Sequence, residues 1–202
     1  MKEKLTVSDS KKLFHEQFPY VIPGLYKRIV DELLVELNLL NHQNEFIQEY
    51  LFCVGLTETF KQLTIGYKPE EHLVLLFESL CNSSNFAPSK IKEISKKTLE
   101  QYKEKSLKQI AILLKEKSTS NLYSSRILNL GIYLIISNAS DFNITDDSER
   151  NNIISETVKN LNLSVNKAEK DIGIYKSSII KLQQAKELLQ EAKIKDKKES
   201  NK

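Results

Sequence analysis

The sequence predicts an all-α protein, a helical bundle followed by a long C-terminal helix of heptad character. Apolar residues recur at steps of three and four along most of the 202 residues, which is the spacing of one face of an α-helix. The chain contains no Asn-Gly or Asp-Gly hairpin signal and no sustained alternation of apolar and polar residues, so we predict no strand. We expect a bundle domain at residues 6–145, the long helix at 146–195 and a disordered tail at 196–202.

The first two helices are predicted from proline and from capping residues. A short helix over residues 10–18 is expected to follow Ser8 or Asp9, either of which can cap its first turn. A second helix over residues 24–40 begins directly after Pro23, because proline fits a helix start but not a helix interior.

The third helix is predicted over residues 45–65, with Gly66 as its stop. Gly55 lies in its middle, where glycine costs about 1 kcal/mol relative to alanine. Such a glycine is usually retained where another backbone comes close. We therefore expect close packing against another helix at this position.

The remaining bundle helices follow two further prolines. Pro69 opens a helix that continues to Leu80, and Pro88 opens the next. The lysine-rich stretch after Pro88 is expected to divide into two helices near Lys105, where the apolar positions fall out of step. Residues 126–137 form the most hydrophobic segment, which we expect to be the most buried helix.

The C-terminal part has a heptad pattern over five repeats. One continuous helix from about residue 148 to 195 would be on the order of 70 Å long, so its far end would project from the bundle. Either its first turns pack on the body and the rest is solvated, or the apolar stripe contacts a second copy or another protein. Tyr175, Ile179 and Leu182 are the candidate contacts on this stripe. The pattern comprises Ile154, Val158, Leu161, Val165, Ala168, Ile172, Tyr175, Ile179, Leu182, Lys186 and Leu189.

The second helix has apolar residues on both sides. Its wide apolar face, which is typical of packing on a core, comprises Tyr26, Ile29, Val30, Leu33, Leu34, Leu37 and Leu40. Val35 and Leu39 lie instead on the opposite, charged arc, and this placement indicates a docking face. The candidate partner-binding residues are Arg28, Glu32, Val35, Glu36 and Leu39. The alternative is that Arg126 reaches across to Glu32 or Glu36 and fixes helix packing.

No catalytic, cofactor-binding or metal-binding residues are predicted, so we do not expect an enzyme. The three histidines lack a second histidine three to five residues away and a glutamate three residues before, which argues against zinc and di-iron sites. No phosphate-binding glycine motif is present. Cys53 and Cys81 lack Cys-x-x-Cys spacing and lie in apolar segments, so buried, inert thiols are expected.

Composition limits the partners and the compartment. The net charge of +3 comes from intermixed lysine and glutamate, unlike the clustered basic surface of a nucleic-acid binder. No apolar stretch is long enough to span a bilayer, and the first ten residues show no signal or transit pattern. We expect the chain to stay in the reducing compartment where it is made, with any membrane contact peripheral.

Three segments resemble the thylakoid formation protein family. The family pattern V-S-D-(S/T)-K, then Y-x-R-(I/V)-V-(D/E)-E-L-L-V-E-x-x-L-L, is matched by Val7, Ser8, Asp9, Ser10, Lys11, Tyr26, Arg28, Val30, Glu32, Leu33, Leu34, Val35, Glu36, Leu39 and Leu40. A second motif is matched by Gly55, Leu56, Phe60, Gly66 and Tyr67. Around the third motif Ser125, Arg126 and Gly131 match, while the family's tyrosine is displaced by one residue.

The resemblance implies a non-enzymatic factor on the cytoplasmic side of the thylakoid membrane that supports photosystem II biogenesis and repair. It further implies a partner, the membrane-bound FtsH protease complexes, which the protein would bind and support. The residues alone leave open a different function, that of a helical scaffold that self-associates through its heptads without a link to a protease.

Overall fold

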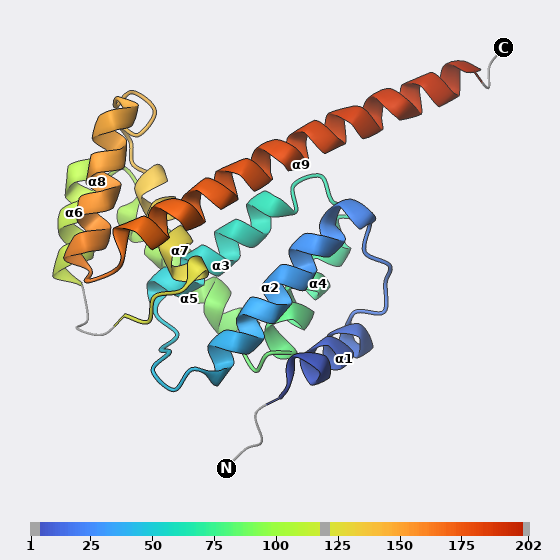
Figure 1. Ribbon diagram of the computed structural model, residues 1–202, viewed down its shortest axis with the longest axis horizontal. Coiled ribbons are helices and arrows are strands. Elements are labelled where there is room, and N and C mark those ends of the chain that lie inside the picture. The colour runs from blue at the N-terminus through green and yellow to red at the C-terminus, as the bar shows by residue number, and fades with distance from the viewer. Residues whose placement is uncertain (1–4, 118–121, 200–202) are drawn as a thin grey trace.

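The computed structural model describes residues 5–117 and 122–199. These residues form helices joined by turns, with no strand among them, which confirms the predicted all-α fold (Figure 1). The helices are α1 (Val7–Gln17), α2 (Gly24–His42), α3 (Tyr50–Leu63), α4 (His72–Asn82), α5 (Pro88–Tyr102), α6 (Leu107–Glu116), α7 (Arg126–Ser137), α8 (Asp147–Asn160) and α9 (Val165–Glu199).

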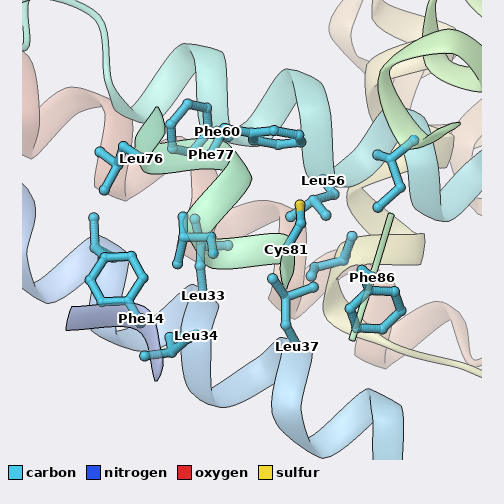
Figure 2. Close-up of a cluster of buried hydrophobic side chains, with 14 of the residues drawn as sticks. Phe14, Leu33, Leu34, Leu37, Leu56, Phe60, Leu76, Phe77, Cys81 and Phe86 are labelled. Atoms are coloured by element: carbon cyan, nitrogen blue, oxygen red, sulfur yellow. The ribbon is translucent and has the colours of Figure 1, made fainter. Parts of the chain in front are cut away.

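Two apolar clusters form the core. The first gathers side chains of α1, α2, α3 and α4, among which Leu33, Leu34 and Leu37 point from α2 toward the other helices (Figure 2). The second is built from α6, α7, α8 and the first half of α9. Helices α3 and α7 contribute to both clusters and therefore join the two halves of the bundle.

The crossing of α3 and α7 depends on two glycines. A Cβ atom on Gly55 would lie 1.9 Å from the carbonyl oxygen of Ile127, and one on Gly131 would lie 1.9 Å from the carbonyl oxygen of Leu51. The close packing expected at Gly55 is thus confirmed. The helix predicted over residues 126–137 is observed at the same residues, and most of its side chains are buried as expected.

The starts of three helices differ from prediction: α3 begins at Tyr50 rather than at residue 45, α4 begins at His72 rather than at Pro69, and α1 also begins at another residue. Helix α1 begins earlier than expected because Thr6 is its cap: the Thr6 hydroxyl accepts from the Asp9 N–H at 3.1 Å and the Asp9 carboxylate accepts from the Thr6 N–H at 3.0 Å. Ser8 and Asp9 therefore lie inside the helix rather than at its cap. The break predicted near Lys105 is confirmed, since Ser106 caps α6 with a capping box.

The single long C-terminal helix was a wrong prediction. A turn at residues 161–164 separates α8 from α9, with Asn162 in the left-handed region at φ 57°, a conformation that asparagine tolerates better than most residues. Leu161 and Leu163 on either side of it are buried. The heptad spacing continues across this turn because apolar side chains on both sides of it pack on the core. The spacing therefore reports which side chains are buried and does not require a continuous helix.

Helix α9 nevertheless extends beyond the bundle. Its 35 residues span about 52 Å at 1.5 Å per residue, and its C-terminal half leaves the body (Figure 1). The helix continues to Glu199, so residues 196–199 are helical where a disordered tail was predicted, and residues 200–202 of that prediction lie outside the described residues. Helix α8 packs against α6 and α7 and belongs to the bundle.

Candidate functional site

The outer side of α2 forms a groove of about 630 Å³. All five residues of the predicted docking face line it. Leu39 is 53% exposed and Val35 is half-buried, so the described helices leave this apolar pair accessible. The lining comprises Gly24, Lys27, Arg28, Asp31, Glu32, Val35, Glu36, Leu39 and Arg126.

The groove exists because α2 uses its other face for the core. Tyr26, Val30 and Leu33 are nearly inaccessible to solvent, and this face fixes the rotation of the helix about its axis. With one face committed to the core, Val35 and Leu39 necessarily point away from it. Lys27 and Asp31 also line the groove, although they are not among the predicted docking residues. Their position in the charged arc of α2 is the only sequence signal that could have identified them.

Arg126 connects α7 to one wall of the groove. Its Nε donates to Oε2 of Glu36 at 2.8 Å, and its Nη2 lies 2.7 Å from the same oxygen. Its Nη1 lies 3.6 Å from Oε2 of Glu32, while the backbone N–H of Ile127 donates to Oε1 of Glu36 at 3.1 Å. The expected cross-link from Arg126 to these glutamates is therefore present, and it positions α2 against the start of α7.

Burial and charge act in opposite directions on this cluster. Burial raises the pKa of Glu36, and the Arg126 guanidinium and the Ile127 N–H oppose that rise only in part. For Arg126, burial disfavours the charged form, but Glu36 and Glu32 outweigh burial and raise its pKa. Arginine is therefore fully charged here, and it is the group that permits a carboxylate to be ionised at a buried position.

The rim of the groove carries two ion pairs along α2. Nε of Arg28 lies 2.8 Å from Oε1 of Glu32, and Nζ of Lys27 lies 3.6 Å from Oδ2 of Asp31. Both pairs are largely exposed, so each contributes at most about 1 kcal/mol to stability. An apolar centre with a polar, charged rim is the usual composition of a protein-binding surface.

Metal and thiol chemistry receive no support from the described part of the chain. No group of three or more histidine, cysteine, aspartate or glutamate side chains there could hold a metal ion. Burial raises the pKa of Cys53 to about 11 and that of Cys81 to about 12. Both thiols are fully buried, as expected of structural cysteines.

The candidate contacts on the heptad stripe of α9 (the C-terminal seam) are Tyr175, Ile179 and Leu182, and they do not lie on a free surface. Tyr175 and Leu182 are 8% and 5% exposed and belong to the two core clusters, and Ile179 packs against the second cluster. The structure corrects the interpretation of these residues as an open docking stripe, because they attach α9 to the bundle. Among the residues of α9 whose side chains are described, the exposed large apolar ones are instead Ile174, Ile180, Leu188 and Leu189.

The fold and this site define a helical bundle with an apolar groove rimmed by charge. The thylakoid formation protein family matches residues 6–202, and the chain belongs to this family. The resemblance found in the sequence is thereby confirmed. No helix in the described residues is both long and apolar enough to cross a membrane.

Individual relatives agree with this assignment. The chain is 82% identical over 202 residues to Protein Thf1 of Prochlorococcus marinus subsp. pastoris (strain CCMP1986 / NIES-2087 / MED4), with all of both chains covered. It is 71% identical over 200 residues to Protein Thf1 of Prochlorococcus marinus (strain MIT 9312), covering 99% of this chain and 100% of the relative. The solved structure of Psb29 superposes with a TM-score of 0.86 at 26% identity, covering 98% of this chain and 100% of that one.

Proposed function

We propose that this protein is a non-enzymatic factor that supports photosystem II biogenesis and repair, and thylakoid formation, by binding membrane-bound FtsH protease complexes. The proposal takes the partner from the family resemblance and the contact surface from the structure. Its main support is the accessible pair Val35 and Leu39 in the groove on α2.

The groove is suited to receive apolar side chains of a protein partner. Val35 and Leu39 are held on a helix whose opposite face is anchored in the core, so they lose little conformational freedom on binding. Full burial of an exposed side chain of this size contributes about 1.5–3 kcal/mol, and because both side chains are already about half-buried, a partner that covers them gains about half of that for each. The ion pairs of Arg28 and Lys27 at the rim add little affinity, but their fixed charges select the orientation of the partner.

We place the protein on the cytoplasmic side of the thylakoid membrane as a peripheral component. This location agrees with membership of a family named for thylakoid formation and with a membrane-bound partner. The interaction with the protease would hold the bundle at the membrane, and α9, which extends away from the body, would remain available for a second contact (Figure 1).

Affinity capture with a tagged full-length chain tests the proposal. The bait is expressed in a cyanobacterium, the thylakoid membranes are solubilised, and the recovered FtsH subunits are quantified. Leu39→Glu should abolish FtsH recovery because it introduces a charge into the apolar floor of the groove. Ile112→Glu is the matched control, since Ile112 lies on α6 and is 58% exposed, outside the groove.

Each outcome has a definite meaning. Loss of FtsH with Leu39→Glu and retention with Ile112→Glu support both the function and the surface. Equal recovery with both variants would exclude the α2 groove as the contact, and absence of FtsH from the unsubstituted bait would contradict the function itself.

The exposed apolar residues of α9 favour a second candidate, a helical scaffold that self-associates. Leu188 and Leu189 are 66% and 52% exposed on the projecting part of the helix. Light scattering across a concentration series distinguishes this function: a dimer that Leu188→Lys dissociates would favour the scaffold, and a monomer at all concentrations would exclude it.

A further inference from the structure

Helices α3, α4 and α5 enclose a second groove, separate from the one on α2, with a volume of about 820 Å³. Its volume falls within the range of about 300–1,000 Å³ that is typical of small-molecule sites. None of its lining residues lines the groove on α2. Its apolar lining comprises Phe60, Ile65, Leu73, Val74, Phe77 and Leu99.

One end of the groove is aromatic. Phe60 and Phe77 meet edge to face with ring centroids 5.1 Å apart, and both are buried (Figure 2). Ile65 and Val74 stand at the opening, 55% and 58% exposed. This part of the groove can cover a hydrocarbon chain, because a buried floor and accessible walls are both apolar.

Three hydroxyl groups in the lining, those of Thr57, Ser95 and Tyr67, lack hydrogen-bond partners in the described part of the chain. Thr57 and Ser95 are 6% and 1% exposed, and Oγ1 of Thr57 and Oγ of Ser95 contact neither solvent nor any donor or acceptor in the described part of the chain. Helical threonines usually donate to a carbonyl one turn earlier, as Thr98 does to the carbonyl of Ile94 at 2.8 Å. Unpaired buried hydroxyls are costly, so this part of the lining is not fully satisfied by the fold itself.

The α5 wall of the groove carries lysines. Nζ of Lys92 lies 5.1 Å from the centroid of the Phe77 ring and 3.2 Å from Oε1 of Glu78. Lys96 lies one turn further along α5, and Lys103 is the residue directly after this helix, about 16 Å from Lys92 along its axis. Neither lysine belongs to an ion pair in the described part of the chain.

The acidic residues of the lining leave an excess of positive charge at that end. Glu58 pairs with Lys61 at 2.6 Å, and Glu70 pairs with Lys68. Glu100 is the remaining carboxylate of the lining, and its single negative charge is outnumbered by the two positive charges of Lys96 and Lys103. The groove is therefore apolar at the Phe77 end and cationic toward Lys103.

We propose that this groove binds a single-chain anionic amphiphile, an alkyl chain that ends in a carboxylate or phosphate. The chain lies over Phe60 and Phe77, and the anionic head contacts Lys96 and Lys103. A helix of a protein partner fits less well, because a cavity of about 820 Å³ has the size of a small-molecule site. This site would bind a small ligand, in addition to the protein partner that we propose for the groove on α2.

Fluorescence titration of the purified full-length protein with 11-(dansylamino)undecanoic acid tests the proposal. We expect saturable binding that dodecanoate competes away and its methyl ester does not. The double variant Lys96→Gln/Lys103→Gln should bind about tenfold more weakly, which corresponds to about 1.4 kcal/mol. The matched control is Lys170→Gln/Lys181→Gln, which removes two exposed lysines of α9 and should leave the affinity unchanged.

A second variant examines the apolar end. Val74→Asp changes an exposed side chain, so the fold should persist, as its thermal melting curve will show, while probe binding is lost. Absence of saturable binding, equal competition by the methyl ester, or equal weakening by the control variant would overturn the proposal. Displacement by inorganic phosphate alone, or binding to anionic vesicles that dodecanoate does not compete away, would also overturn it, by indicating an anion site or a membrane surface instead.

Discussion

Replacement of Gly55 by alanine should destabilise the fold far more than the loss of a glycine normally does. The added Cβ would lie 1.9 Å from the carbonyl oxygen of Ile127 and 2.9 Å from the N atom of Gly131. Both obstacles are backbone atoms, so no side chain can rotate to make room. Helices α3 and α7 would have to separate by about 1 Å, which weakens the dispersion contacts along the whole crossing.

The expected magnitude follows from two opposing contributions. Alanine gains about 1 kcal/mol over glycine in helix propensity, whereas overpacking costs about 1–3 kcal/mol, and more where the backbone must shift. Because both obstacles are backbone atoms and the crossing joins both core clusters, the overpacking cost should reach about 4 kcal/mol or more. The net loss in the free energy of unfolding is then about 3 kcal/mol or more. Gly131→Ala should behave in the same way, since its Cβ would meet the carbonyl oxygen of Leu51 at 1.9 Å.

Gly173 offers a matched control within the same chain. It lies inside α9, and no atom outside the neighbouring backbone of the helix comes within 4 Å of the Cβ position. Gly173→Ala should therefore raise the free energy of unfolding by about 0.5–1 kcal/mol. Urea denaturation followed by far-UV circular dichroism measures all three variants. If Gly55→Ala were as stable as the unsubstituted protein, or if Gly55→Ala and Gly173→Ala shifted stability in the same direction, the close crossing would be refuted.

Three further predictions concern buried groups. Arg126→Met should cost about 2–4 kcal/mol near pH 7. The substitution removes the cation that opposes the effect of burial, so the folded-state pKa of Glu36 rises further above its unfolded value. The folded state of the variant then binds the proton more tightly than the unfolded state does. The loss in the free energy of unfolding, measured by urea denaturation, should therefore shrink as the pH falls toward about 4.3. Cys53 and Cys81 should resist maleimide labelling near pH 8 until the protein unfolds, because burial raises both pKa values. Leu182→Ala should cost about 2–4 kcal/mol, since this side chain is only 5% exposed; a negligible cost in the same assay would contradict the packing of α9 on the first cluster.

The sequence was most informative where one residue type has a single structural use. Pro88 lies at the first position of α5, and Gly66, with φ 80°, follows the end of α3, as their backbone preferences predict. Gly55 was recognised because glycine is unfavourable inside a helix unless it fits a close approach. Asn162 and Ser164 favour turns and helix caps, but the turn between α8 and α9 is hidden in the sequence because the apolar spacing continues across it.

The two grooves differ in how far a sequence can reveal them. The groove on α2 is lined almost entirely by one helix, so the periodicity around Val35 and Leu39 was sufficient to find it. The groove between α3, α4 and α5 is formed by residues that packing brings together from three segments. Neither Ser95 nor Val74 is unusual in its own segment, and only the fold shows that a buried hydroxyl and an accessible apolar side chain share one cavity.

The seam of α9 shows why a heptad pattern alone does not identify a partner. The same spacing serves a helix that packs on its own bundle and one that packs on another chain. The exposed fraction changes along the seam, from 5% at Leu182 to 52% at Leu189, so the helix leaves the body between these two residues. Since the bundle already occupies the seam up to Leu182, a partner that binds through the seam must contact the part beyond it, and a substitution at Leu189 affects such a partner without disturbing the core.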